Sequence, residues 1–264
     1  MKKILVLLSL LVLATSCDWF VFDNQESYNA QVEGRFIDSQ TGQMVPFSWP
    51  NTSYVSIIEE GWDGEEAQKW YVKCDGSYRN KLVWAGKYRM DIKDQCFYPV
   101  EVPFTLERGK NTIDFTVTPY ARILNPQITY EGTKFVARFT VQVSDAAQTP
   151  NVDVCLFGFT DRYVSDGNNN FVFDNTKKND QPEGKIKKVK LTDGQADVVL
   201  KIDTTIDSGM QFVYKRDHYL RIGAVASGSA NTNKRYNFSP VFKVSGDFSK
   251  IEEVTLWDED KLYE

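Results

Sequence analysis

Histidine is nearly absent from this 264-residue chain, which contains a single His at position 218. A Ser-His-Asp triad would have to use His218, and no serine lies in the G-x-S-x-G turn that often presents such a nucleophile. The chain also lacks a cluster of His and Cys at zinc-ligand spacing. The acidic pairs Glu59-Glu60 and Glu65-Glu66 could serve glycoside hydrolysis, but they lie in a polar turn, where carboxylates are usually only solvated. We therefore predict that the protein is not an enzyme and that it has no metal site and no cofactor.

Long basic and long apolar stretches are missing as well. The net charge is −5, and the lysines between positions 185 and 190 alternate with Ile186 and Val189. This alternation indicates the solvated face of a strand, so no nucleic-acid partner is predicted. The N-terminal apolar run from Ile4 to Leu13 is too short for a transmembrane helix, which needs about 20 apolar residues.

The same run has the features of a secretory signal. Lys2 and Lys3 precede it, and the small residues of 14–16 follow it directly before Cys17. The order resembles a bacterial lipobox, with Ala14 where that motif most often has Leu. It predicts a signal peptide at 1–16 and a lipidated Cys17, with ordinary cleavage after Ser16 or an uncleaved anchor as the alternatives. Because two or more acyl chains anchor a protein stably, a fully processed Cys17 would hold it on the membrane.

Cysteine is scarce, with four residues in the chain. Once Cys17 is lipidated an odd number remains. Cys74 and Cys96 lie in the same half of the chain and could form a disulfide. Cys155 is surrounded by apolar residues, which favours a buried and inert thiol.

Almost every other segment has the alternation of a β-strand. In residues 134–143, one face carries Phe135, Ala137, Phe139, Val141 and Val143. The segments 111–117 and 196–202 alternate in the same way, and Gly-containing turn signals separate them. No window keeps a clean helical period. We predict an all-β chain of two antiparallel β-sandwiches in tandem, after the signal peptide.

The chain divides best near Pro119, because proline cannot continue a central ladder. We predict a lipidated tether at 17–30, one sandwich at 31–120 and a second at 121–264. The polar stretch 165–184 is predicted to be a loop within the second sandwich.

The first half resembles the carboxypeptidase-regulatory, transthyretin-like sandwich. The matching residues are Gly34, Asp38, Thr41, Gly42, Gly76, Tyr78, Gly86 and Tyr88. The order of segments such as GRFIDSQTG, DGSYRNKLVWAGKYRM and FTVTPYARI resembles a two-domain family of Bacteroidetes lipoproteins of unknown function. In the second half, VARFTVQV and YLRIGAVASG are similar to its fibronectin-III-like domain. The resemblance implies a lipid-anchored protein of the outer membrane, often encoded beside SusC/SusD-like glycan importers.

These features together predict a surface lipoprotein that assists glycan capture or import, by binding carbohydrate or an importer of the SusC/SusD type. Acidic residues soon after Cys17 resemble export signals for the cell surface, so the protein is expected to face the exterior. Exposed aromatic rings in polar loops are the candidates for carbohydrate binding, with packing within the loops as the alternative. They are Trp49, Trp62 and Tyr163. The main rival function is a structural surface component, such as an adhesin or a fimbrial-type subunit.

Overall fold

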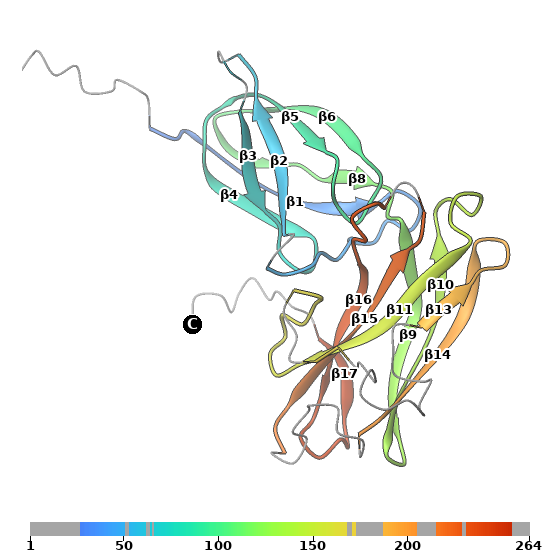
Figure 1. The fold of residues 1–264 in the computed structure, drawn as a ribbon. Helices are drawn as coiled ribbons and strands as arrows, with labels where there is room; N and C mark the ends of the chain where they lie inside the picture. The colour runs from blue at the N-terminus through green and yellow to red at the C-terminus, as the bar shows by residue number, and fades with distance from the viewer. Residues whose placement is uncertain are drawn as a thin grey trace, which may run out of the picture.

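The computed structural model describes residues 27–50, 53–61, 64, 66–167, 171–172, 187–204, 215–228 and 231–254. Within these residues the protein is all-β, as predicted, and no helix long and apolar enough to cross a membrane occurs there. The strands form two units that stack end to end, the first drawn blue to green and the second yellow-green to red (Figure 1). The first unit contains β1 (Ala30–Asp38), β2 (Tyr54–Glu59), β3 (Ala67–Tyr71), β4 (Ser77–Val83), β5 (Gly86–Ile92), β6 (Val100–Leu106), β7 (Gly109–Thr112) and β8 (Phe115–Val117). The second contains β9 (Ala121–Glu131), β10 (Lys134–Val143), β11 (Asn151–Phe159), β12 (Phe171–Val172), β13 (Lys187–Lys190), β14 (Gln195–Asp203), β15 (His218–Ala226), β16 (Asn237–Val244) and β17 (Ile251–Val254).

The first unit consists of two four-stranded sheets. One has the order β4-β1-β7 with β8 also paired to β1, and the other has the order β3-β2-β5-β6. Their inner faces enclose an aromatic core that includes Phe36, Trp70, Tyr78, Tyr88 and Phe115. One feature departs from a purely antiparallel sandwich, since β7 and β8 both pair with β1 in parallel.

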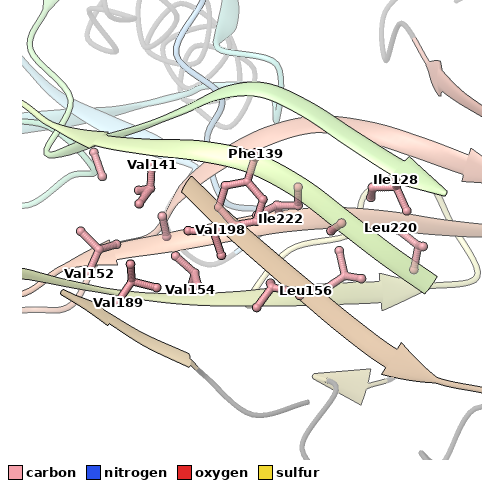
Figure 2. Packing of buried hydrophobic residues seen from close by; sticks show 14 of the residues in the cluster. Ile128, Phe139, Val141, Val152, Val154, Leu156, Val189, Val198, Leu220 and Ile222 are labelled. Atoms are coloured by element: carbon pink, nitrogen blue, oxygen red, sulfur yellow. The ribbon is translucent and has the colours of Figure 1, made fainter. Parts of the chain in front are cut away.

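The second unit packs a three-stranded sheet, β14-β10-β9, against a six-stranded sheet built on β12-β11-β15-β16-β17, with β13 paired to β11. Figure 2 shows Phe139, Val141 and Val198 of the first sheet facing Val154, Leu156 and Ile222 of the second. The alternating residues that the sequence assigned to one face of 134–143 are all buried. The predicted loop 165–184 contains the short strand β12, which extends the larger sheet.

Buried polar contacts join the two units. The Asp38 carboxylate accepts two hydrogen bonds from the Arg122 guanidinium, at 2.5 Å from Nε and 2.6 Å from Nη2. The Asn237 side chain bridges the backbone of both units, because its Nδ2 donates to the Cys96 carbonyl and its Oδ1 accepts from the Ala121 amide. Such pairing is needed at a buried junction, where an unsatisfied polar group costs about 1–3 kcal/mol.

Arg221 is the most buried of these junction residues, with 1% of its surface exposed. Its guanidinium donates to the carbonyls of Phe47 and Cys74 in the first unit, at 3.1 and 2.8 Å. It also donates to the carbonyls of Val164 and Ser239, and it lies 4.4 Å from the centroid of the Phe238 ring. Burial lowers the pKa of Arg221 to about 10, so the side chain stays charged at neutral pH and can hold all four carbonyls.

Candidate functional site

A cavity of about 430 Å³ opens on the outer face of the β3-β2-β5-β6 sheet. The ladder between β2 and β5 covers only three residue pairs, ending at Ile57–Met90. Beyond that point Tyr54 and Ser56 line one side of the cavity, and Asp91 and the residues after β5 line the other. The Gln95 amide donates to the Tyr54 carbonyl at 2.6 Å, which links the two sides again. The cavity thus lies where two neighbouring strands separate.

An aromatic pair lies next to this cavity, and Tyr54 is the member of the pair that lines it. Tyr54 of β2 pairs with Tyr71 of β3, and their ring centroids are 6.3 Å apart in an edge-to-face arrangement. Tyr54 is half-buried, whereas Tyr71 is 62% exposed. The Lys69 ammonium lies 4.6 Å from the centroid of the Tyr54 ring. Strand alternation explains the placement, because Val55 and Trp70 point into the core and their neighbours point outward.

Two acid–base pairs form the polar rim of the cavity. Lys93 Nζ lies 3.0 Å from the Asp91 carboxylate. Asp94 accepts hydrogen bonds from the Arg235 guanidinium of the second unit, one from Nε at 2.9 Å and one from Nη2. These bonds with Arg235 hold the pKa of Asp94 below its ordinary value, although partial burial opposes the shift. The site is therefore built from both units.

The arrangement combines the two elements that a sugar-binding surface needs. Exposed tyrosine rings offer flat apolar faces against which the C–H face of a pyranose can lie. Carboxylate, amide and guanidinium groups supply acceptors and donors for hydroxyls at its edges. A few polar groups around a partly apolar hollow are typical of small-ligand sites.

The loop aromatics predicted from sequence fall elsewhere. Trp49 and Tyr163 are both half-buried, and their ring centroids are 6.0 Å apart. They border a small apolar cluster at the junction, where the Trp49 amide donates to Ser165 Oγ at 3.2 Å. This contact between the units supports the packing alternative for these two residues, and their role in carbohydrate binding stays a prediction. Trp62 and the lipidation site Cys17 lie outside the described residues.

The disulfide that Cys74 and Cys96 could form is absent from the structure. Cys74, Cys96 and Cys155 are buried thiols, and no disulfide joins any of them. Cys74 packs with Cys155 in the junction cluster, whereas Cys96 packs into the core of the first unit. The two side chains belong to different clusters, which proximity in sequence could not reveal. Burial raises the pKa of Cys96 to about 12.

The other tryptophans of the first unit that the structure describes lie away from the cavity. Trp70 is buried in the aromatic core, whereas Trp84 lies in the turn between β4 and β5, half-buried against Tyr28. His218, the single histidine of the chain, is 2% exposed at the start of β15. Its pKa is lowered by burial and by the nearby charge of Arg216.

Sequence reasoning missed Tyr54, Tyr71 and Arg235. The signal for the tyrosines was present, because the alternation in 54–58 and 67–71 assigns both rings to the solvent face. No local pattern points to Arg235, which is 141 residues from its partner Asp94.

A second cavity, of about 420 Å³, lies along the junction beside Asp38 and Arg122. Its walls are mainly apolar and include Met44, Pro46, Ile123, Leu124, Pro126 and Pro240. The described residues contain no cluster of three or more metal-ligating side chains at either cavity.

Comparison with known proteins matches the first unit to a family of unknown function. Residues 30–118 match the model of the DUF3823 N-terminal domain, a protein family of unknown function. No curated protein matches the chain.

Solved structures extend the similarity to most of the chain. A proposed carbohydrate binding protein from Bacteroides uniformis is 26% identical, with a TM-score of 0.69, over 83% of this chain and 99% of that one. A DUF3823 family protein from Parabacteroides merdae is 19% identical, with a TM-score of 0.62, over 83% and 99% of the two chains. A DUF3823 family protein from Bacteroides ovatus is 20% identical, with a TM-score of 0.58, over 82% of this chain and 98% of that one. The first unit is thus matched by the N-terminal domain of the DUF3823 family of Bacteroidetes proteins, and the chain shares the fold of solved DUF3823 structures over most of its length.

Proposed function

We propose that this protein is a non-catalytic surface lipoprotein that assists glycan capture or import, and that it holds carbohydrate on the face around Tyr54. The observation that carries the proposal is the tyrosine pair Tyr54–Tyr71 beside a cavity rimmed by Asp91 and Asp94. The description of the Bacteroides uniformis relative as a proposed carbohydrate binding protein agrees with it.

The chemistry of the cavity fits binding better than hydrolysis. A glycosidase needs one carboxyl group whose pKa is raised, so that it can protonate the leaving group. The pKa of Asp94 is shifted in the opposite direction by Arg235, which keeps this carboxylate ionised at neutral pH. An ionised carboxylate accepts hydrogen bonds from sugar hydroxyls but cannot act as a general acid.

The proposed location follows from the N-terminal sequence. Lipidation of Cys17 would anchor the protein in the outer membrane, and the segment 17–30 would hold the two units at the cell surface. There the protein could pass glycan to an importer of the SusC/SusD type, its proposed partner.

Binding to a glycan array, followed by titration calorimetry of the hits, tests the sugar-binding step. Tyr54→Ala and Tyr71→Ala should each weaken binding by about 1 kcal/mol or more, the usual threshold for an interface residue that matters. The melting temperature should change little, because both rings lie on the outer face. Tyr28→Ala is the matched control, since Tyr28 is an exposed tyrosine away from the cavity, packed on Trp84.

The array also separates this function from its rivals. A strong effect of Trp62→Ala with none from Tyr54→Ala would move the site to the loop predicted from sequence. A protein that binds no glycan and polymerises in solution would instead be a structural surface component of the adhesin or fimbrial type.

A further inference from the structure

The charges around the Tyr54 cavity are paired with one exception. Lys93 neutralises Asp91, and Arg235 neutralises Asp94. Arg89, on the same face of β5, lies 3.7 Å from Glu101 and 3.9 Å from Asp91. Among the residues that the structure describes, Lys69 has no acidic partner, and its ammonium contacts only the Tyr54 ring. The face therefore has an excess positive charge, on a protein whose net charge is −5.

The position of Lys69 suits a ligand contact. It is exposed on the edge strand β3, and it pairs across the sheet with Ser56, which lines the cavity. An exposed cation–π contact contributes only about 0.5–1 kcal/mol. A bound anion can therefore draw the ammonium off the ring, and the ring is then open to a sugar.

Lys93 offers a second cation at the opposite side of the cavity. Its side chain is 79% exposed, and exposed ion pairs such as Lys93–Asp91 contribute about 0–1 kcal/mol. Exchange of Asp91 for a ligand carboxylate or sulfate would therefore cost little. Lys93 lines the cavity directly, whereas Lys69 lies on β3, next to the side of the cavity that Tyr54 and Ser56 line.

From this placement we infer that the face selects a glycan whose sugars carry negative charge, such as uronic acids or sulfated sugars, with Lys69 as the main counter-ion. The inference rests on the proposed function, because it names the class of carbohydrate that the Tyr54 face takes. Tyr54 and Tyr71 would supply stacking, and Lys69 would supply the charge-assisted hydrogen bond that distinguishes an acidic sugar from a neutral one.

The test compares matched charged and neutral ligands by calorimetry. The probes are oligogalacturonides with their methyl esters, and κ-carrageenan oligosaccharides with their desulfated form; the first pair tests a carboxylate and the second a sulfate. We expect at least one charged probe to bind about tenfold more tightly than its neutral partner, and to bind more weakly when salt rises from about 0.05 M to about 0.5 M.

Variants assign the selectivity to Lys69. Lys69→Gln should lower affinity for the charged probe about fivefold to tenfold and leave neutral-sugar affinity unchanged. Lys69→Arg keeps the positive charge and should retain the affinity for the charged probe. Lys81→Gln is the control, because it removes the same charge from the exposed side of β4 in the other sheet.

The outcomes separate this inference from the proposed function. Equal affinity for charged and neutral probes, with loss of both in Tyr54→Ala, overturns the inference and keeps the function. Preference for a charged probe that survives in Lys69→Gln overturns the role of Lys69. Binding of no probe and no array glycan overturns both proposals.

Discussion

Arg122 of the second unit and Asp38 of the first form a bidentate ion pair whose side chains are 5% and 6% exposed. The same carboxylate closes the turn after β1, where it accepts from the Gln40 amide and the Thr41 hydroxyl. A single side chain therefore fixes a local turn and the contact between units.

Removal of Arg122 should destabilise the protein strongly. Arg122→Met would leave the Asp38 carboxylate buried without its counter-ion, which typically costs about 3–5 kcal/mol. Chemical denaturation measures the loss. The control is Arg35→Met, because Arg35 pairs with Asp114 in an exposed bridge that should contribute about 0–1 kcal/mol. Equal effects of the two substitutions would contradict the importance of the buried pair.

The same ion pair should make the free energy of unfolding depend on pH in the acidic range. Burial alone would raise the pKa of Asp38, but its hydrogen bonds with Arg122 and with the turn lower it below the ordinary 3.8. A depressed folded-state pKa contributes stability that is present above the unfolded value and is lost as pH falls through the folded value. The difference in unfolding free energy between wild type and Arg122→Met should therefore shrink below about pH 4. A constant difference down to about pH 2 would rule this out.

Arg221 should couple the folding of the two units. Arg221→Lys keeps the charge but cannot span four carbonyls or stack on Phe238, so buried acceptors lose their donors. We expect a loss of at least about 2 kcal/mol and separate unfolding of the units. Hydrogen exchange that follows β5 and β10 independently measures this. Arg108→Lys, an exposed substitution, is the control, and a single cooperative transition in Arg221→Lys would contradict the coupling.

The cysteines should be inert in the folded protein. Burial raises the pKa of Cys96 to about 12 and also raises that of Cys155. Because the thiolate is the reactive form, a thiol reagent at about pH 8 should modify Cys74, Cys96 and Cys155 only on unfolding. The measurement uses a soluble form that lacks Cys17. Fewer than three reactive thiols in denaturant would restore the disulfide hypothesis.

Lipidation is testable in the cell that makes the protein. Cys17→Ala should abolish acyl labelling and stop the normal lipid anchoring, because the expected anchor is covalent and single. Cys155→Ala serves as the control, since Cys155 is a buried thiol of the folded unit. A wild-type protein without acyl label would contradict lipidation and leave secretion after cleavage at Ser16, or an uncleaved anchor, as the alternatives.

Local patterns in the sequence were sufficient to predict most of the strands and the turns between them. The alternation in 134–143 predicts which side chains of β10 are buried, because a strand's side chains alternate between its two faces. Gly42 and Gly76 have φ angles of 68° and 95°, as their hairpin turns require. These properties depend on neighbours in the chain, so the chain itself determines them.

Only the tertiary structure decided which strands pair and which side chains contact each other across the sheets. Gly34 has no local turn to explain it, yet a Cβ there would lie 1.7 Å from the Ile113 carbonyl oxygen of the segment between β7 and β8. The parallel pairing of β1, the separate burial of Cys74 and Cys96, and the Asp94–Arg235 rim of the cavity have the same origin. A periodic pattern specifies the buried face of a strand but not its partner, because the partner is selected by packing between segments far apart in sequence.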